Sequence, residues 1–390
     1  MRPASSYAAV PPHGLQPGQE PGHKGRASLL QDISMPLSDD PDRALREDPS
    51  SSDPETADAD TQARAADAAH VPEHPVVVIT GASSGIGHAI ALAFARRGAC
   101  LVLASRNPDT LAPVALACRK AGGHAIGVPT DVTDASAVRV LAQKALRHFG
   151  RIDVWVNGVG VGAIGRFDEV PVEAHRRVLE ANLLGHLHGA HAVLPHFRER
   201  GVGRLINLIS IGGWVPAPYA AAYTASKFGL RGLSESLRAE VSDLPHVHVC
   251  DVAPTFVDSP GLSHGANYTG RRIRPPLPMV DPHRVAETVV GLSRALRPRS
   301  VTWMGLGALP GRVAHAVAPD TVARWMRCLS DWGLARARPE PESDGNLFAP
   351  SQGTAVAGGH RKRRAGAVGL VVALGVAGIA YGWWAGRQRR

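Results

Sequence analysis

A tyrosine and a lysine four residues apart, Tyr223 and Lys227, occur in the segment AAAYTASKFGLRGLSESLRAE. The periodicity of this segment predicts a helix, on which residues four apart lie on one face. A free phenol has a pKa of about 10, and a neighbouring ammonium group would favour the phenolate and lower that pKa. The pair is therefore a candidate proton donor and the charge that tunes it, although this spacing alone is also common in surface pairs.

A glycine-rich segment, TGASSGIG at residues 80–87, follows the apolar run PVVVIT and precedes the helical pattern HAIALAFARRG. Glycine is needed where the backbone turns tightly or approaches a phosphate without a Cβ in the way. The N-terminus of the following helix offers unpaired N–H groups and the positive end of its dipole. The strand–turn–helix context predicts a dinucleotide-binding turn.

Apolar runs alternate with helical patterns over residues 74–305. The predicted strands lie at residues 75–80, 100–105, 124–132, 152–160, 204–210 and 247–254. This alternation predicts an α/β domain with a doubly wound, parallel sheet. Ligands of such sheets bind at the carboxyl ends of the strands, where the glycine turn also lies.

The glycine spacing and the tyrosine–lysine pair together indicate a family. Gly81, Gly85 and Gly87 follow G-x-x-x-G-x-G, where the generic dinucleotide fold has G-x-G-x-x-G. With YxxxK at the right interval downstream, residues 74–305 resemble the short-chain dehydrogenases/reductases of the compact, single-domain branch. The resemblance implies a Rossmann sheet of about seven strands and hydride transfer between NAD(P) and a carbonyl/alcohol pair.

The resemblance also implies a catalytic tetrad of Asn182, Ser210, Tyr223 and Lys227. Ser210 ends a predicted strand thirteen residues before Tyr223, and Asn182 lies in LEANLLG on the preceding helix. In these roles Tyr223 donates the proton and Ser210 polarises the carbonyl oxygen. Lys227 also bonds the nicotinamide ribose, and Asn182 holds a water that links Lys227 to solvent.

Cofactor choice depends on the end of the second strand, where Ser105 and Arg106 stand in place of an acidic residue. A guanidinium suits a 2′-phosphate, so NADP(H) is preferred and NAD(H) is possible. Ser84 stands where many NADP-using relatives carry a second basic residue. The residues that the resemblance assigns to the cofactor are Thr80, Gly81, Ser83, Ser84, Gly85, Ile86, Gly87, Ser105, Arg106, Asp131, Val132, Asn157, Gly160, Tyr223, Lys227, Pro254, Val257 and Ser259.

The remaining segments differ in composition from the catalytic domain. Residues 1–73 carry a net charge of −7 without apolar periodicity, so we expect a disordered arm. Two appended helices are expected at 306–334 and a polar linker at 335–360. Residues 365–384 carry no charge and are flanked by arginines, which predicts a single-pass transmembrane helix.

These features predict a membrane-anchored, NADP(H)-dependent oxidoreductase acting on a small carbonyl or alcohol substrate. Assembly of this enzyme into a homo-oligomer is possible. Four scattered cysteines and the absence of a signal-peptide pattern favour a cytoplasmic catalytic domain. We expect no metal site and no nucleic acid partner. Two alternatives stay open: an isomerase or dehydratase that shares the YxxxK pair, and a non-catalytic nucleotide-sensing or scaffold protein.

Overall fold

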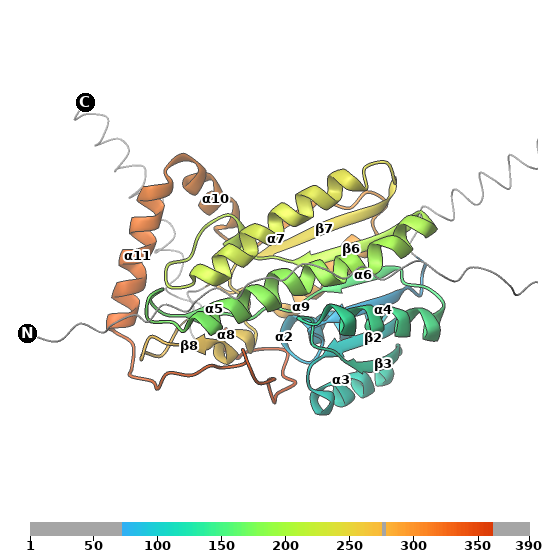
Figure 1. Cartoon of the computed structure of the whole chain (residues 1–390), viewed down its shortest axis with the longest axis horizontal. Helices are drawn as coiled ribbons and strands as arrows, with labels where there is room; N and C mark the ends of the chain where they lie inside the picture. The colour runs from blue at the N-terminus through green and yellow to red at the C-terminus, as the bar shows by residue number, and fades with distance from the viewer. Residues whose placement is uncertain (1–71, 275–277, 362–390) are drawn as a thin grey trace, which may run out of the picture. The chain divides into compact units, whose positions relative to one another are not determined.

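The computed structural model describes residues 72–274 and 278–361. Seven strands form one sheet in the order β3-β2-β1-β4-β6-β7-β9, with every neighbouring pair parallel (Figure 1). In that order they are β3 (His124–Pro129), β2 (Cys100–Ser105), β1 (Val76–Thr80), β4 (Val154–Asn157), β6 (Val202–Leu208), β7 (His246–Pro254) and β9 (Val301–Met304). This arrangement confirms the predicted Rossmann-like α/β class.

Helices cover both faces of the sheet, and each face has its own apolar core. One face packs against α2 (Gly85–Ala95), α3 (Pro108–Lys120) and α9 (Pro282–Arg294). The opposite face packs against α4 (Ala135–Phe149) and α6 (Gly185–Arg200), with α7 (Ala221–Glu240) and α5 (Val172–Leu179) beside them. Burial on both faces explains why the central strands are continuous apolar runs such as VVVIT.

Local signals in the sequence set where several helices begin and end. The side chain of Asn107 accepts a hydrogen bond from the backbone of Asp109 at the start of α3, and Pro108 follows it as the first helical residue. Asp134 caps α4 in the same way, through the N–H of Ser136. Gly150 ends α4 in a left-handed conformation, with φ of 77°, that costs glycine little.

Smaller elements gather near the carboxyl ends of the strands. The short strands β5 (Ala163–Ile164) and β8 (Ala266–Asn267) pair in parallel, and α8 (Gly261–His264) precedes β8. Tyr268, which follows β8, is buried, and its phenol donates to the Asp344 carboxylate at 2.7 Å. After the sheet, α10 (Ala308–Val317) and α11 (Pro319–Ala335) form the appended pair of helices.

The structure differs from the sequence-based expectation after α11. The sequence predicts a linker at 335–360, but residues 336–361, which we call the strap, run back along the catalytic domain past α8 and β8 (Figure 1). Ser343 and Asn267 form an antiparallel bridge, and Leu347 is 1% exposed. The strap bonds mainly through backbone groups, which a polar composition does not reveal.

The predicted transmembrane helix at 365–384 lies outside the described residues, as does nearly all of the N-terminal arm. Between residues 72 and 361, leaving out 275–277, the structure contains no helix long and apolar enough to cross a membrane.

Candidate active site

The glycine turn joins β1 to α2 at the centre of the sheet. Gly81 and Gly85 have positive φ values of 73° and 55°, and an added Cβ on Gly87 would lie 2.1 Å from the carbonyl oxygen of Gly81. Glycine is therefore required at 87 because the turn folds back on itself. Ser84 precedes α2 without capping it through its side chain, so the first N–H groups of the helix must find other acceptors.

Three of the four predicted catalytic side chains meet at the carboxyl end of β6. Tyr223 and Lys227 lie one turn apart on α7, with the Lys227 ammonium nitrogen 5.7 Å from the centre of the Tyr223 ring. Ser210 follows β6, and its side chain acts to lower the pKa of the Tyr223 phenol. It has φ of 150° and ψ of 162°, a conformation rare outside glycine and typical of residues held by their surroundings.

A glycine keeps space open between the two hydroxyl groups. An added Cβ on Gly212 would lie 3.1 Å from the Tyr223 ring and 3.6 Å from the Ser210 oxygen. The N–H of Gly212 donates to Ser210 Oγ at 3.1 Å, which orients that hydroxyl. A carbonyl oxygen placed between Ser210 and Tyr223 would therefore meet two donors.

Burial shifts the pKa values of this cluster. Desolvation lowers the pKa of Lys227 to about 7, and the ammonium nitrogen donates to the Leu208 carbonyl at 3.0 Å. Desolvation also raises the pKa of Tyr223, which the Ser210 hydrogen bond opposes. The predicted lowering of the Tyr223 pKa is thus not found here, because the burial of the phenol itself outweighs the opposing effect of Ser210.

Asn182 lies in a π-helical turn, η1 (Glu180–Leu184), between α5 and α6, and is fully buried. Its amide bonds both backbone groups of Val161, accepting from the N–H at 2.8 Å and donating to the carbonyl at 2.9 Å. It also donates to Ser226 Oγ at 3.1 Å. Asn182 therefore ties the loop after β4 to the catalytic helix, and π-helical turns of this kind recur at functional sites.

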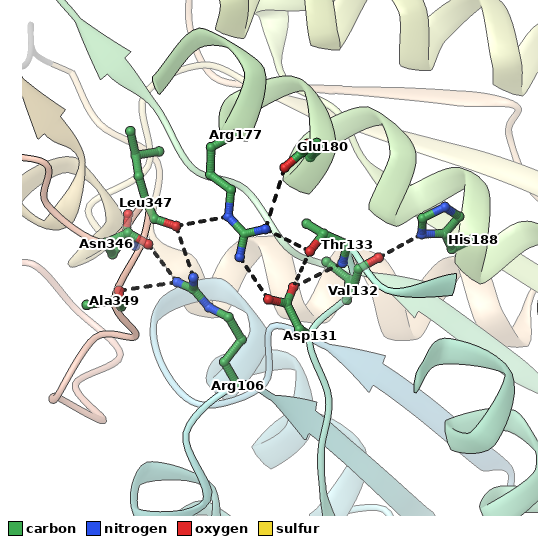
Figure 2. Close-up of polar contacts among 10 residues, drawn as sticks. All are labelled: Arg106, Asp131, Val132, Thr133, Arg177, Glu180, His188, Asn346, Leu347 and Ala349. Atoms are coloured by element: carbon green, nitrogen blue, oxygen red, sulfur yellow. Dashed lines mark hydrogen bonds and ion pairs between the residues drawn. The ribbon is translucent and has the colours of Figure 1, made fainter. Parts of the chain in front are cut away.

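Arg106, predicted to hold a 2′-phosphate, lies at the carboxyl end of β2 and contacts the strap (Figure 2). Its guanidinium donates to the carbonyls of Asn346 at 2.6 Å and Leu347 at 3.0 Å. Arg177 of α5 donates to the same Leu347 oxygen at 3.2 Å. Arg177 also pairs with Asp131 at 2.8 Å. Arg106 and Asp131, which were both predicted to contact the cofactor, therefore belong to one polar network.

The other predicted cofactor residues lie around the carboxyl ends of the strands, and some serve the fold. Asn157 accepts from Trp155 and donates to Asn207, so its side chain is engaged inside the sheet. Gly160 is exposed, while Val257 is buried and bridges to Val280 after β7. The partly exposed residues of this group are Ser83, Ser84, Ile86, Ser105 and Ser259, and the buried ones are Thr80, Val132 and Pro254.

Three residues near the site were not identified from the sequence. Arg177 looks like any exposed helix arginine until the fold places it beside Asp131. Asp258 is buried and accepts from the N–H groups of His360 and Arg361. His186 is buried without a partner for Nε2, and desolvation, aided by the Lys227 charge, holds its pKa well below the ordinary value.

The lowered pKa of Lys227 predicts a pH-dependent stability. Between the folded pKa of about 7 and the unfolded value of 10.5, the unfolded chain binds more protons, so the free energy of unfolding should rise with pH. Lys227→Met should remove up to about 1.4 kcal/mol per pH unit of that slope. Urea unfolding at several pH values measures it. The exposed Lys120→Met is the control, and equal slopes for Lys227→Met and wild type would contradict the assignment.

The sequence of this chain is similar to a family model and to known proteins. A family model described as short chain dehydrogenase matches residues 75–267. The chain is 32% identical over 277 residues to the uncharacterized oxidoreductase YxnA of Bacillus subtilis, covering 70% of this chain and 77% of that protein. It is 36% identical over 201 residues to 11-beta-hydroxysteroid dehydrogenase A of Sesamum indicum, covering 51% of this chain and only 57% of that protein.

Solved structures agree with this similarity. A short-chain dehydrogenase from Streptomyces avermitilis is 27% identical with a TM-score of 0.57, covering 66% of this chain and 98% of that one. An alcohol dehydrogenase from the archaeon Thermococcus sibiricus, complexed with 5-hydroxy-NADP, is 29% identical with a TM-score of 0.52, covering 59% of this chain and 95% of that one.

Proposed function

Because the chain belongs to the short-chain dehydrogenase family, we propose that it is an NADP(H)-dependent oxidoreductase that interconverts a carbonyl compound and an alcohol. The observation that carries this proposal is the convergence of Ser210, Tyr223 and Lys227 at the carboxyl end of β6. The 5-hydroxy-NADP bound by the Thermococcus sibiricus enzyme and the position of Arg106 after β2 support the choice of cofactor.

The residues around the turn fit a dinucleotide. Gly81 and Gly87 allow the tight approach of backbone at the α2 N-terminus, whose N–H groups suit a pyrophosphate. Arg106 and Arg177 supply two guanidinium groups at the carboxyl ends of β2 and β3, where a 2′-phosphate would lie. When bound, the nicotinamide supplies or accepts the hydride.

The chain's own residues handle the proton and the charge at the carbonyl oxygen. Ser210 and Tyr223 donate to that oxygen, and the raised pKa of the buried phenol keeps Tyr223 protonated, as reduction of a carbonyl requires. Lys227, directed at this site from one helical turn away, stabilises the phenolate left after the transfer. Oxidation of an alcohol uses the same groups in reverse, with Tyr223 as the base.

The substrate class is proposed from the sequence beyond the described residues. The uncharged segment 365–384 between arginine clusters supports attachment to a membrane, and the four scattered cysteines support a catalytic domain in the cytoplasm. Such attachment would place the site near lipophilic molecules, and one relative is a hydroxysteroid dehydrogenase. We therefore propose a lipophilic carbonyl or alcohol as substrate.

The full chain in detergent, supplied with NADPH or NADH and a panel of steroid, retinoid, fatty acyl and terpenoid carbonyl compounds, tests the proposal. The expected result is loss of nicotinamide absorbance with at least one compound, faster with NADPH. Cofactor binding without turnover across the panel and across matching alcohols would favour a non-catalytic protein. Conversion of a substrate without net cofactor oxidation would favour an isomerase or dehydratase.

A further inference from the structure

The strap is attached to the domain at two places. On the near side, Ser343 pairs with Asn267, the Tyr268 phenol holds Asp344, and Leu347 is buried in the apolar cluster under α5. On the far side, the backbone N–H of Gly358 donates to the Asp258 carbonyl at 3.1 Å. The Asp258 carboxylate accepts from the next backbone N–H groups of the strap, those of His360 and Arg361.

Between these attachments the strap places backbone oxygens on donors of the cofactor site. Arg106 donates to Asn346, Leu347 and, at 3.4 Å, Ala349 (Figure 2). The N–H of Gly85, at the start of α2, donates to the Ala355 carbonyl at 2.8 Å. His88, one turn further on, lies 2.7 Å through Nδ1 from the Thr354 carbonyl.

These donors are of the kind that bind phosphate. A guanidinium group and the first N–H groups of a helix both favour an anion over a neutral carbonyl. The Leu347 oxygen is shared by Arg106 and Arg177, so one strap atom stands between two cations, as a phosphate oxygen would (Figure 2). A donor that bonds the strap in this geometry must give up that bond before it can bond a ligand phosphate.

We propose that the strap is an internal ligand of the phosphate-binding end of the cofactor site and competes there with NADP(H). This inference rests on the proposed function. NAD(H) lacks the 2′-phosphate and depends less on Arg106, so the docked strap disfavours NADP(H) more than NAD(H). The strap thereby lowers the affinity for NADP(H) and reduces the preference of the site for NADP(H) over NAD(H).

The central part of the strap is suited to reversible release. Leu347 is the one residue of 346–357 that is buried, and Phe348 is 52% exposed. The bonds that the strap makes to Arg106, Gly85 and His88 all use its backbone oxygens, so phosphate oxygens can replace them one for one. Leu347 and the partly buried Val356 are the apolar side chains that release of this segment uncovers. The attachments at Tyr268 and Asp258 remain in place, so the released segment stays tethered at both ends and can bind the same donors again.

Two substitutions in the full chain test the competition from opposite ends of the strap. An added Cβ on Gly358 would lie 2.8 Å from the Ser259 carbonyl oxygen, so Gly358→Val should lift the far attachment. Leu347→Ser should weaken the near one. Gly353→Val is the matched control, because an added Cβ on Gly353 meets nothing within 4 Å.

The probe is adenosine 2′,5′-bisphosphate, titrated by calorimetry, with NADPH and NADH fluorescence as a second readout. Lifting the strap should lower the Kd for the bisphosphate and for NADPH about tenfold, and that for NADH much less, while Gly353→Val stays at the wild-type value. Unchanged or weaker binding in Gly358→Val and Leu347→Ser would overturn the strap proposal alone. Absence of NADPH binding in every variant would overturn the cofactor assignment and the competition with it.

Hydrogen exchange on the wild-type chain provides a test without substitutions. Adding the bisphosphate should speed amide exchange at Asn346 and Leu347, because their N–H groups donate to the carbonyls of His264 and Asp344 only while the strap is docked. Slower exchange there would show that the strap closes over the ligand and would overturn the proposal.

Discussion

Tyr223→Phe is expected to lower kcat/KM for carbonyl reduction about 10³-fold while leaving the Kd for NADPH within about twofold of wild type. The substitution removes the phenolic proton and keeps the ring that packs beside Gly162 and Gly212. Because the lost interaction is made in the transition state, kcat should fall with kcat/KM. Steady-state kinetics with the best compound of the panel, together with NADPH fluorescence, measure both quantities.

Tyr219→Phe provides the matched control for this prediction. Tyr219 lies four residues before Tyr223, but its phenol bonds Asp331 of α11 and takes no part in the catalytic cluster. The control should retain kcat/KM within about twofold. If Tyr223→Phe kept a tenth or more of the wild-type rate, another group would have to supply the proton and the assignment of Tyr223 would be wrong.

Gly87→Ala is expected to destabilise the protein by about 3–5 kcal/mol and to abolish NADPH binding. The new Cβ would lie 2.1 Å from the carbonyl oxygen and 2.8 Å from the carbonyl carbon of Gly81. Both atoms are backbone, so relief requires the turn to open and the N–H groups at the start of α2 to move. Urea unfolding measures the loss of stability, and fluorescence titration measures the loss of binding.

Gly291→Ala in α9 separates this steric effect from the general effect of a glycine substitution. Gly291 is exposed, and an added Cβ there meets nothing within 4 Å. Alanine at an exposed helix position should stabilise the protein by about 0.5–1 kcal/mol. Equal unfolding free energies for Gly87→Ala and wild type would contradict the geometry of the turn.

The fold could be predicted because most of its strands and helices carry their own local pattern. Buried strands such as β1 and β2 are apolar runs, and side-chain caps such as Asn107 and Asp134 mark where helices begin. The last strand, β9, has no such pattern: it lies at the sheet edge as VTWM, and only Met304 in it is buried. Its presence was implied by the family resemblance and not by the residues themselves.

The catalytic chemistry was also available from the sequence, because its parts are short-range. Tyr223 and Lys227 are one helical turn apart, and the glycine turn spans residues 80–87. The electrostatic state of the pair was not available, since it depends on burial. The folded structure buries both side chains, so desolvation brings the pKa of Lys227 to about 7 and raises the pKa of Tyr223, where the sequence predicted a lower value.

The sequence by itself determined the sheet, the glycine turn and the residues that could move a proton, because these depend on periodicity and spacing within one or two elements. Only the tertiary structure decided what the cofactor donors contact. Arg106 and Asn346 are 240 residues apart, and Arg177 and Leu347 are 170 apart. Their bonds use backbone carbonyls that every residue has, so no side-chain pattern could have predicted that the strap lies across the phosphate-binding end of the site.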